Sequence, residues 1–416
     1  MIPQTAAEPA IPTFAEARRS VEECAARLAP TGTEMVSLVE ALGLVLAEDL
    51  RADRDFPPFP RSTRDGYAVR AADLAATPAR LRCVGEIKAG ATVEQSAIAI
   101  STGDAAEIMT GAPIPSGADA VLMLEYTERK GESVTAHRSV RSGENIVSAG
   151  SEARKGATMV ARGTRINHAI VAVAAAIGRA EVATYRRPRV AVLATGDEVV
   201  DINLPPGPNE IRNSNSYSLA AQVQAAGGEP LILPVAPDSA DELALLLRKG
   251  LQAELLLISG GVSMGRYDLV EQVLASFDAR FLFTGAKIQP GRPVVFGEAR
   301  LHERTVPFFG LPGNPVSTMV TFQLFARPLL DGLAGAKPQP LPFAQARLKA
   351  EFRTKTGLTR FLPARLGGTH EKPEVELVPW QGSGDLMAVS RANCYIVVPP
   401  EREHFAAGEA MTVLLF

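Results

Sequence analysis

The sequence predicts a multidomain protein of the α/β plus β class, with a doubly wound, mainly parallel α/β domain at its centre. Between Arg187 and Leu333, short apolar runs alternate with segments of helical spacing, which is typical of a parallel sheet covered by helices on both faces. The preceding part of the chain is punctuated by glycine and proline at short spacing. After the linker KPQPLP (337–342), only short strand-like runs follow. With 416 residues, the chain is long enough for two to four domains.

Composition excludes several classes of protein. The 46% hydrophobic and 21% charged residues are typical of a globular protein, and a net charge of −3 provides no global basic field for nucleic acid. No apolar stretch is long enough to cross a bilayer, and the first residues lack a signal pattern, so we expect a cytoplasmic protein that binds no membrane. Cys24, Cys83 and Cys394 are far apart, which predicts reduced, partly buried thiols.

The N-terminal half contains one predicted helix and a β-rich region. Apolar residues from Phe14 to Leu28 recur on one face of a helix. The segment RDFPPFPRSTRDGYAVR (54–70) is too rich in proline for a helix and is predicted to be a stiff loop. Val84 to Val134 and Gly143 to Gly163 are predicted to form strands and turns.

The central part alternates strands with helices. The predicted strands are RVAVLATGDE (189–198), EPLILPVAPD (229–238), AELLLISGG (253–261), RFLFTGAKI (280–288), RPVVFG (292–297) and VPFFGLPG (306–313). The predicted helices are residues 215–227, ended by glycine, 239–251, capped by Ser239 or Asp238, 268–277, and 314–333, with Pro315 in the first turn.

Three glycine-rich turns lie within this central part. They read SGGVSMG (259–265), QPGRP (289–293) and GLPGNPVS (310–317), and each follows a predicted strand. A strand, a turn and a helix start bring free backbone N–H groups and a positive dipole end to one place. Ligands of open parallel sheets bind at the carboxyl ends of the strands. We therefore predict one composite oxyanion site at one edge of the sheet.

Charged residues follow the same strand ends. The acids are Asp197, Glu198, Asp238 and Asp268, and such carboxylates beside a phosphate suit Mg²⁺; for Asp238 and Asp268, capping of a helix is the alternative interpretation. The bases are Arg212, Lys287 and Arg292, which suit a phosphate or a similar oxyanion, with a surface ion pair as the alternative.

These residues belong to a longer series of ordered motifs. The series is PPFPRSTRDGYA, IMTGAPIPSGADAV, GENI, ATGDE, EIRNSNS, SGGVSMGRYD, PGRP, GLPGNPVS and QGSG followed by AN. In them the chain resembles the molybdopterin molybdenumtransferase family (the MoeA type, which includes the E domain of gephyrin) along nearly its whole length.

The resemblance implies a reaction and an architecture. The family takes adenylylated molybdopterin and molybdate as substrates, inserts molybdenum and releases AMP, with Mg²⁺ assisting. It implies a homodimer that works with other proteins of molybdenum-cofactor synthesis. It also implies four domains, expected at 29–50 with 154–183 (dimerisation), 51–153 (β-rich), 11–28 with 184–335 (α/β, molybdopterin-binding) and 336–416 (C-terminal β-barrel).

The resemblance also implies roles for individual residues. Asp65 and Thr110 are expected to act from the partner subunit, and Glu198, Asp238 and Asp268 to form the catalytic and metal-binding group. Pro290, Ser317, Arg360 and Ser383 are expected to line the molybdate pocket. The remaining expected ligand-binding residues are Ser259, Gly260, Gly261, Ser263, Lys287, Gly291, Arg292, Gly313 and Asn314.

The chain departs from the family pattern at five positions, namely Arg64 for methionine, Val147 for arginine, Glu152 for aspartate, Gly285 for lysine and Gln289 for lysine. Glutamine at position 289 occurs in the family, so the expected loss near the site is two positive charges, at Val147 and Gly285, and Arg64 is a candidate to restore one. A molybdopterin-binding scaffold with weak catalysis is therefore an alternative, which the intact acidic group disfavours. An adenylyltransferase that makes the adenylylated substrate is a further alternative, disfavoured by the β-domains on both sides of the α/β part.

Overall fold

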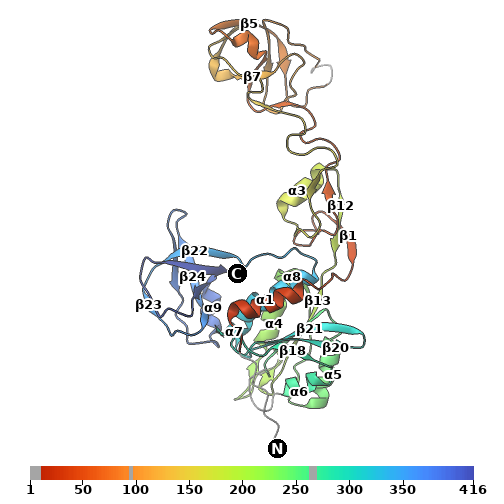
Figure 1. The fold of residues 1–416 in the computed structure, drawn as a ribbon, viewed down its shortest axis with the longest axis vertical. Coiled ribbons are helices and arrows are strands. Elements are labelled where there is room, and N and C mark those ends of the chain that lie inside the picture. The colour runs from red at the N-terminus through yellow and green to blue at the C-terminus, as the bar shows by residue number, and fades with distance from the viewer. Residues whose placement is uncertain (1–10, 93–96, 262–268) are drawn as a thin grey trace, which may run out of the picture.

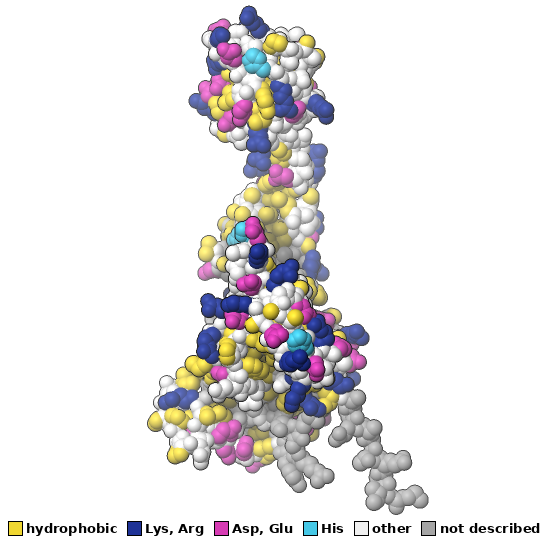
Figure 2. Space-filling model, turned by 90° about the vertical axis from the view of Figure 1, so that its left-hand side faces the viewer, with side chains coloured by type: hydrophobic (Ala, Val, Ile, Leu, Met, Phe, Trp, Pro, Cys, Tyr) yellow, Lys and Arg dark blue, Asp and Glu magenta, His cyan; other side chains and the backbone are white. Residues whose placement is uncertain are grey.

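The computed structural model describes residues 11–92, 97–261 and 269–416 of an elongated molecule (Figure 1). A β-rich unit lies at one end, and a narrow stem joins it to a base. The base consists of an α/β unit and, beside it, a C-terminal β unit. Figure 2 shows the same outline from the side, with charged side chains of both signs spread over the upper unit.

The α/β unit is built on a six-stranded sheet with the order β16-β13-β17-β21-β20-β18. Its strands are β13 (Arg189–Ala194), β16 (Glu229–Ile232), β17 (Leu255–Ser259), β18 (Arg280–Phe283), β20 (Val295–Leu301) and β21 (Arg304–Leu311). The first four strands in this order are parallel, and β20 is antiparallel to both of its neighbours, β21 and β18. The predicted strands and the mainly parallel sheet are confirmed.

Helices cover both faces of this sheet because side chains alternate between two apolar cores. On β13, Val190 and Val192 belong to one core, and Ala191 and Leu193 to the other. The first core packs under α1 (Phe14–Ala25), α4 (Ser214–Ala225), α7 (Pro315–Thr321), the π-helical η3 (Phe322–Ala326) and α8 (Arg327–Leu333). The second packs under α5 (Ala240–Gly250) and α6 (Leu269–Ala275). The sheet is therefore doubly wound.

The ends of α4 and α5 show how the sequence fixes the local structure. Asn213 accepts a hydrogen bond from Ser216 N–H before α4, and Gly227, with φ of +88°, follows its C-cap. Ser239 occupies the N-cap position of α5, but its side chain makes no capping bond. Asp238 lies before that position, so the alternative in which its carboxylate caps the helix is not realised.

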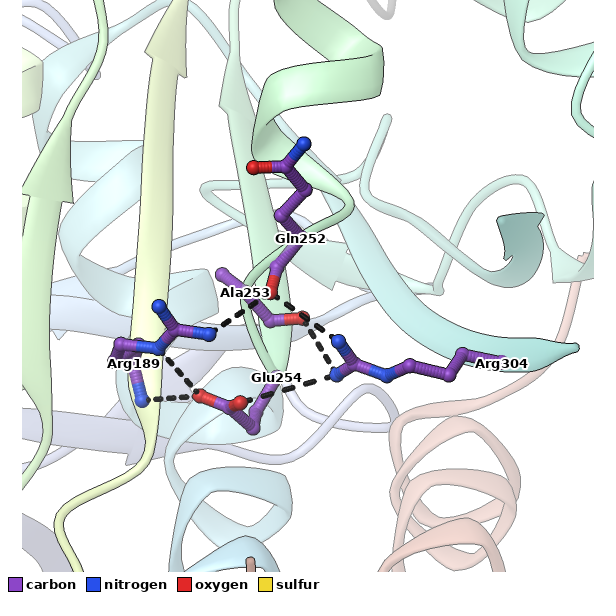
Figure 3. A network of polar contacts seen from close by, with 5 residues as sticks. All are labelled: Arg189, Gln252, Ala253, Glu254 and Arg304. Carbon is purple, nitrogen blue, oxygen red and sulfur yellow. Dashed lines mark hydrogen bonds and ion pairs between the residues drawn. The ribbon is translucent and has the colours of Figure 1, made fainter. Parts of the chain in front are cut away.

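One buried carboxylate ties together the amino ends of three neighbouring strands (Figure 3). Glu254 precedes β17 and is only 9% exposed. Its oxygens accept from Arg189 N–H at 2.7 Å and lie 3.5 and 3.8 Å from the guanidinium groups of Arg189 and Arg304, which begin β13 and β21. Both arginines also donate to the carbonyl of Gln252. This cluster fixes the strand starts at the sheet edge opposite the glycine-rich turns.

The stem consists of two thin strand pairs and one helix. Strand β1 (Thr33–Ser37) pairs with β12 (Glu181–Tyr185), and β2 (Leu50–Arg51) pairs with β11 (Thr158–Val160). These pairs and α3 (His168–Ala176) enclose a small apolar core of their own. The chain therefore leaves the base and returns to it through the same narrow stem.

The β-rich unit is a six-stranded sheet with the order β7-β4-β6-β5-β9-β8. Its elements are β3 (Arg61–Ser62), β4 (Gly66–Val69), η1 (Ala71–Leu74), β5 (Ala79–Ile87), β6 (Asp104–Ile108), β7 (Ala120–Met123), η2 (Leu124–Tyr126), β8 (Thr127–Lys130), β9 (Ser133–Ala136) and β10 (Ile146–Val147). Gly66 begins β4 because a Cβ atom there would lie 2.0 Å from the carbonyl oxygen of Leu122 on β7. Residues 54–70 contain no helix, as predicted, but the expected stiff loop is interrupted by strands β3 and β4.

The C-terminal unit is a closed five-stranded β-barrel. It closes because β24 pairs with both β25 and β26. The elements are β22 (Phe343–Leu348), β23 (Phe352–Arg353), β24 (Thr359–Gly368), β25 (Pro373–Leu377), α9 (Leu386–Arg391), β26 (Cys394–Val398), β27 (His404–Phe405) and β28 (Ala410–Leu415). One short strand from the α/β unit, β19 (Ile288–Gln289), adds to β24. The predicted barrel is confirmed, and its sheet extends into the neighbouring unit.

All three cysteines are free, as predicted. Burial raises the pKa of Cys24 to about 12 and that of Cys394 to about 11, so both thiols stay protonated at neutral pH. Among the residues described here, no helix has both the length and the apolar character needed to cross a bilayer.

Replacement of the Glu254 carboxylate should destabilise the α/β unit. In Glu254→Gln the charge that faces Arg189 and Arg304 is lost, and we expect a loss of about 2 kcal/mol. The measurement is the urea midpoint followed by far-ultraviolet circular dichroism. Glu303→Gln, an exposed carboxylate in the neighbouring turn, is the control and should leave the midpoint unchanged. Equal midpoints for the two variants would show that Glu254 has no such role.

Candidate active site at the carboxyl edge of the sheet

The loops at the carboxyl ends of β13, β17 and β21 are joined side by side. Thr195 N–H, just after β13, donates to Ser259 O at 3.0 Å. Gly260 N–H, just after β17, donates to Leu311 O at 3.1 Å. The hydrogen bonding between neighbouring parallel strands therefore extends one residue beyond the ends of β13 and β17. These two bonds fix the distances between the loops that follow the strands.

The two glycines after Ser259 are required by the close approach of Thr195. Gly260 and Gly261 have φ values of +90° and +61°. A Cβ atom on Gly260 would lie 2.7 Å from Thr195 O, and one on Gly261 would lie 2.6 Å from Thr195 Oγ1. Only glycine allows the backbone to come this close, so the turn presents main chain rather than side chains at the sheet edge.

Asn215 joins the first and the third glycine-rich turns. Its Nδ2 donates to Ser259 Oγ at 2.8 Å and to Gly313 O at 2.7 Å. Asn215 lies in the first turn of α4, whose start is fixed by the Asn213 cap. Gly313 in turn approaches Gly260, because a Cβ atom on Gly313 would lie 3.7 Å from Gly260 Cα. Two predicted turns are thus brought together through a residue that the sequence interpretation did not single out.

Two buried acceptors beside these turns lack a hydrogen-bond partner within the described parts of the chain. They are Asn215 Oδ1 and Thr195 Oγ1. Both residues line a shallow cavity of about 50 Å³, together with Glu198, Arg212 and Gly260. An unsatisfied buried polar atom costs about 1–3 kcal/mol, so a ligand or water that supplies the missing bond is favoured here.

The acidic residues lie on two adjacent loops of this edge. Asp197 Oδ1 accepts from Asp238 N–H at 3.0 Å, which holds the loop after β16 against the loop after β13. Glu198 and Asp238 are exposed and make no side-chain bond to the described residues. Asp268 and Ser263, predicted for metal and ligand binding, lie outside the described residues. The parts that are described contain no group of three His, Cys, Asp or Glu side chains able to hold a metal.

The QPGRP turn reaches from the α/β unit into the barrel. Gln289 on β19 is the register partner of Arg360 on β24, and Lys287 O accepts from Thr359 N–H at 3.1 Å. The Gln289–Pro290 bond is cis, and Gly291 has φ of +100°. A Cβ atom on Gly291 would lie 2.4 Å from Thr321 Cγ2 on α7, so this turn packs directly on that helix.

The start of α7 brings the predicted molybdate-pocket residues into one neighbourhood. Ser317 is buried in its first turn, and Val316 N–H donates to Ser383 O of the barrel at 3.0 Å. Arg360 is 6% exposed and donates through Nε and Nη2 to Lys355 O. Burial lowers the pKa of Arg360 below its ordinary value, yet no carboxylate among the described residues pairs with it. Arg360 is therefore a buried cation with no anionic partner among the described residues.

The other predicted basic residues are exposed. Lys287 precedes the QPGRP turn and Arg292 lies within it, whereas Arg212 lies on β15 (Ile211–Arg212), which pairs with β14 (Val199–Val200) beside Glu198. None of these side chains makes an ion pair with the described residues, so the alternative of a surface salt bridge is not realised. All three cations remain available to an anion.

Asp65 and Thr110 contact each other but lie far from the sheet edge. Asp65 Oδ1 accepts from Thr110 N–H at 2.7 Å and from its hydroxyl at 2.9 Å. These two bonds lower the pKa of Asp65, so the carboxylate is charged at neutral pH. Both residues belong to the β-rich unit, at the opposite end of the molecule from the α/β unit (Figure 1).

The substituted positions Val147 and Glu152 have local partners. Val147 is the register partner of Arg61, and the Arg61 guanidinium lies 3.3 Å from Glu152. An arginine is thus present beside the position where the family pattern often has one, although it comes from the neighbouring strand. Arg64 is exposed, and Gly285 is buried against Ile11.

Comparison with known proteins gives matches to three family models. They are the MoeA N-terminal region (domain I and II) over residues 12–178, a probable molybdopterin binding domain over 191–332, and the MoeA C-terminal region (domain IV) over 345–416.

Curated relatives match most of the chain. The molybdopterin molybdenumtransferase of Bacillus subtilis (strain 168) is 34% identical, with 92% of this chain and 90% of that protein covered. The protein of the same name from Nostoc sp. is 34% identical, with 92% and 88% covered. Among solved structures, the molybdopterin biosynthesis moeA protein from Pyrococcus horikoshii OT3 has a TM-score of 0.78 and 29% identity, and the match covers 98% of this chain and all of that one.

The link made by Asn215 can be tested by its removal. Asn215→Ala eliminates the bonds to Ser259 and Gly313, and we expect a stability loss of about 2 kcal/mol. Hydrogen exchange followed by mass spectrometry should show faster exchange in both turns, at 259–261 and at 310–314. Asn209→Ala in the exposed loop before β15 is the control. Faster exchange in only one turn, or in neither, would contradict the proposed link.

Proposed function

The chain belongs to the molybdopterin molybdenumtransferase (MoeA) family, and we propose that it inserts molybdenum from molybdate into adenylylated molybdopterin with release of AMP. One observation supports this proposal. Two groups of residues suited to anions approach the start of α7, one made by the turns after Ser259 and Leu311, the other by the QPGRP turn with Arg360. Two anionic substrates that must react with each other need such an arrangement.

The pterin-nucleotide substrate would bind along the first region. The turn at Ser259–Gly261 presents backbone because Thr195 leaves no room for side chains. Its neighbour Asn215 and the exposed cation Arg212 line the same small cavity as Ser259 and Gly260. Main-chain N–H groups with a nearby cation suit the phosphates of this substrate.

Molybdate would bind in the second region. It is a tetrahedral dianion, so hydroxyl donors and a fixed cation complement it. Ser317 and Arg360 are both more than nine-tenths buried, and the barrel supplies Ser383 at the same helix start. A dianion would neutralise a guanidinium that has no carboxylate partner in the described chain.

The available donors also fit Mg²⁺. Glu198 and Asp238 are exposed carboxylates on loops held together by the Asp197 bond, and neither forms an ion pair with the described residues. Hard oxygen ligands with room for waters are what Mg²⁺ prefers. These two residues would hold the ion, with Asp268 as a further ligand implied by the family, and the ion would reduce the negative charge of the substrate phosphates.

A second copy of the chain would complete the site. Asp65 and Thr110 form an exposed pair on the β-rich unit, remote from the sheet edge of their own chain (Figure 1). In a symmetric dimer of elongated chains, the β-rich unit of each copy can approach the base of the other. We therefore propose that Asp65 and Thr110 act in trans within a homodimer.

An assay of AMP release tests the reaction. Purified protein with adenylylated molybdopterin, molybdate and Mg²⁺ should release AMP, and omission of molybdate or Mg²⁺ should reduce the rate. Asp238→Asn should lower the rate by at least about tenfold, with substrate binding still measurable, because only charge at the proposed metal site changes. Asp278→Asn, at an exposed turn after α6, is the matched control. Substrate binding without AMP release by the wild type would favour the scaffold alternative.

Mixing two inactive variants tests the action in trans. Asp65→Asn keeps hydrogen bonding to Thr110 but removes the charge, and Asp238→Asn alters the sheet edge. Each variant alone should be nearly inactive. After partial unfolding and joint refolding, mixed dimers should regain activity because one of their two sites has both native residues. If the mixture stays as inactive as its components while wild-type protein survives the same treatment, Asp65 does not act from the partner.

A further inference from the structure

A large cleft lies away from the sheet edge, where the stem, the α/β unit and the linker to the barrel meet. It has two lobes of about 690 Å³ and 440 Å³, which share several lining residues. The walls come from α1, from α8, from the stem segment 162–165 and from the linker 335–342. Its size is within the range of small-molecule sites.

The cleft carries an excess of positive charge. Five basic side chains line its two lobes, against two carboxylates, Glu22 and Asp331. The basic residues are Arg18, Arg162, Arg165, Arg327 and Lys337. Ion pairs join Arg18 to Glu22 and Arg165 to Asp331, each at 2.6 Å. Arg327 and Lys337 form no ion pair with the described residues. The Arg162 side chain forms none either, but the carboxylate of Asp49 lies near it and accepts from Arg162 N–H at 3.0 Å.

The guanidinium of Arg18 lines the cleft and is largely buried. Arg18 is 8% exposed, and its Nη1 donates to the buried carbonyl of Leu324 at 2.6 Å, while Nε is bound to Glu22. Nη2 has no hydrogen-bond partner in the described chain. Arg18 is therefore held in place by two bonds and keeps one donor group for something else.

Lys337 is also positioned by its surroundings. Its N–H donates to Gly163 O at 2.9 Å, and a Cβ atom on Gly163 would lie 3.3 Å from Lys337 Cγ. The lysine stem therefore lies across Gly163, next in sequence to Arg162. Figure 2 shows Lys and Arg side chains, interspersed with carboxylates, at the level where the stem joins the base.

We propose that this junction cleft binds a small phosphate-bearing anion, distinct from the substrates at the sheet edge. Several unpaired cations around a roomy, partly apolar cleft match a compact ligand of multiple negative charge, and arginine forks suit phosphate oxygens. The ligand would contact stem, base and linker together, so its binding would stiffen the junction between them. The proposal does not depend on the reaction proposed above.

Calorimetric titration of the full-length protein with inorganic pyrophosphate tests the proposal. Two variants distinguish the cleft from the proposed substrate site. The double variant Arg162→Ala/Lys337→Ala alters the cleft, and the single variant Arg292→Ala alters the proposed substrate site. We expect the cleft variant to lose at least about tenfold in affinity for one pyrophosphate per chain, a loss of two charge-assisted contacts. Arg292→Ala and the control Lys372→Ala, an exposed lysine on the barrel, should retain that binding.

A variant with improved binding excludes misfolding as the explanation. Glu22→Gln keeps an acceptor for Arg18 but removes one negative charge from the cleft, so pyrophosphate should bind about two- to threefold more tightly. The proposal is overturned if the cleft variant titrates like the wild type, or if Arg292→Ala abolishes all pyrophosphate binding. It is likewise overturned if a hexaglutamate peptide binds the cleft more tightly than pyrophosphate, since the occupant would then be an acidic protein segment.

Discussion

The parallel pairing of β17 with β13 on one side and β21 on the other is the constraint on which the site depends. At the amino ends, Glu254 holds the starts of all three strands through two arginines. At the carboxyl ends, the ladder continues through Thr195 N–H and Gly260 N–H, and Asn215 adds bonds to Ser259 and Gly313. With both ends fixed, the strands cannot slide, so the turns keep the spacing that a bound oxyanion requires.

The barrel is part of this arrangement because it shares hydrogen bonds with the α/β unit. Strand β19 belongs to the chain of the α/β unit but pairs with β24, and Val316 at the start of α7 donates to Ser383. Arg360 thereby reaches the proposed site as a buried cation, whose one hydrogen-bond acceptor in the described part of the chain is Lys355 O. Burial of an unpaired charge is unfavourable, so the energy of anion binding at this point includes relief of that cost. The same burial excludes water, which strengthens the interaction.

The sequence allowed the sheet, its helices and the C-terminal strands to be predicted, because apolar alternation and glycine-rich strand ends are local signals. The closed barrel was expected only from the family resemblance, because its closure depends on strand pairs far apart in the sequence. Asn215 was missed, although EIRNSNS contains it, because its role depends on Ser259 and Gly313, which are 44 and 98 residues away. The N-cap position of Ser239 left the carboxylate of Asp238 free, which the sequence alone could not decide. The pairing of Asp65 with Thr110 could be expected only from the family resemblance, since 45 residues separate them.

The elongated shape makes the stem a mechanical element of the proposed dimer. If Asp65 and Thr110 act on the base of another copy, their position depends on the angle at which the stem leaves its own base. Arg165 joins the two parts, because Nη2 pairs with Asp331 of α8 at 2.6 Å while Nη1 donates to Gly43 O within the stem at 2.7 Å. A small rotation of the stem at this junction moves the β-rich unit, at the far end of the molecule, by a large distance. Cations of the junction cleft line the same lobe as this arginine, so an anion bound there would influence the orientation of Asp65 and Thr110 without touching them.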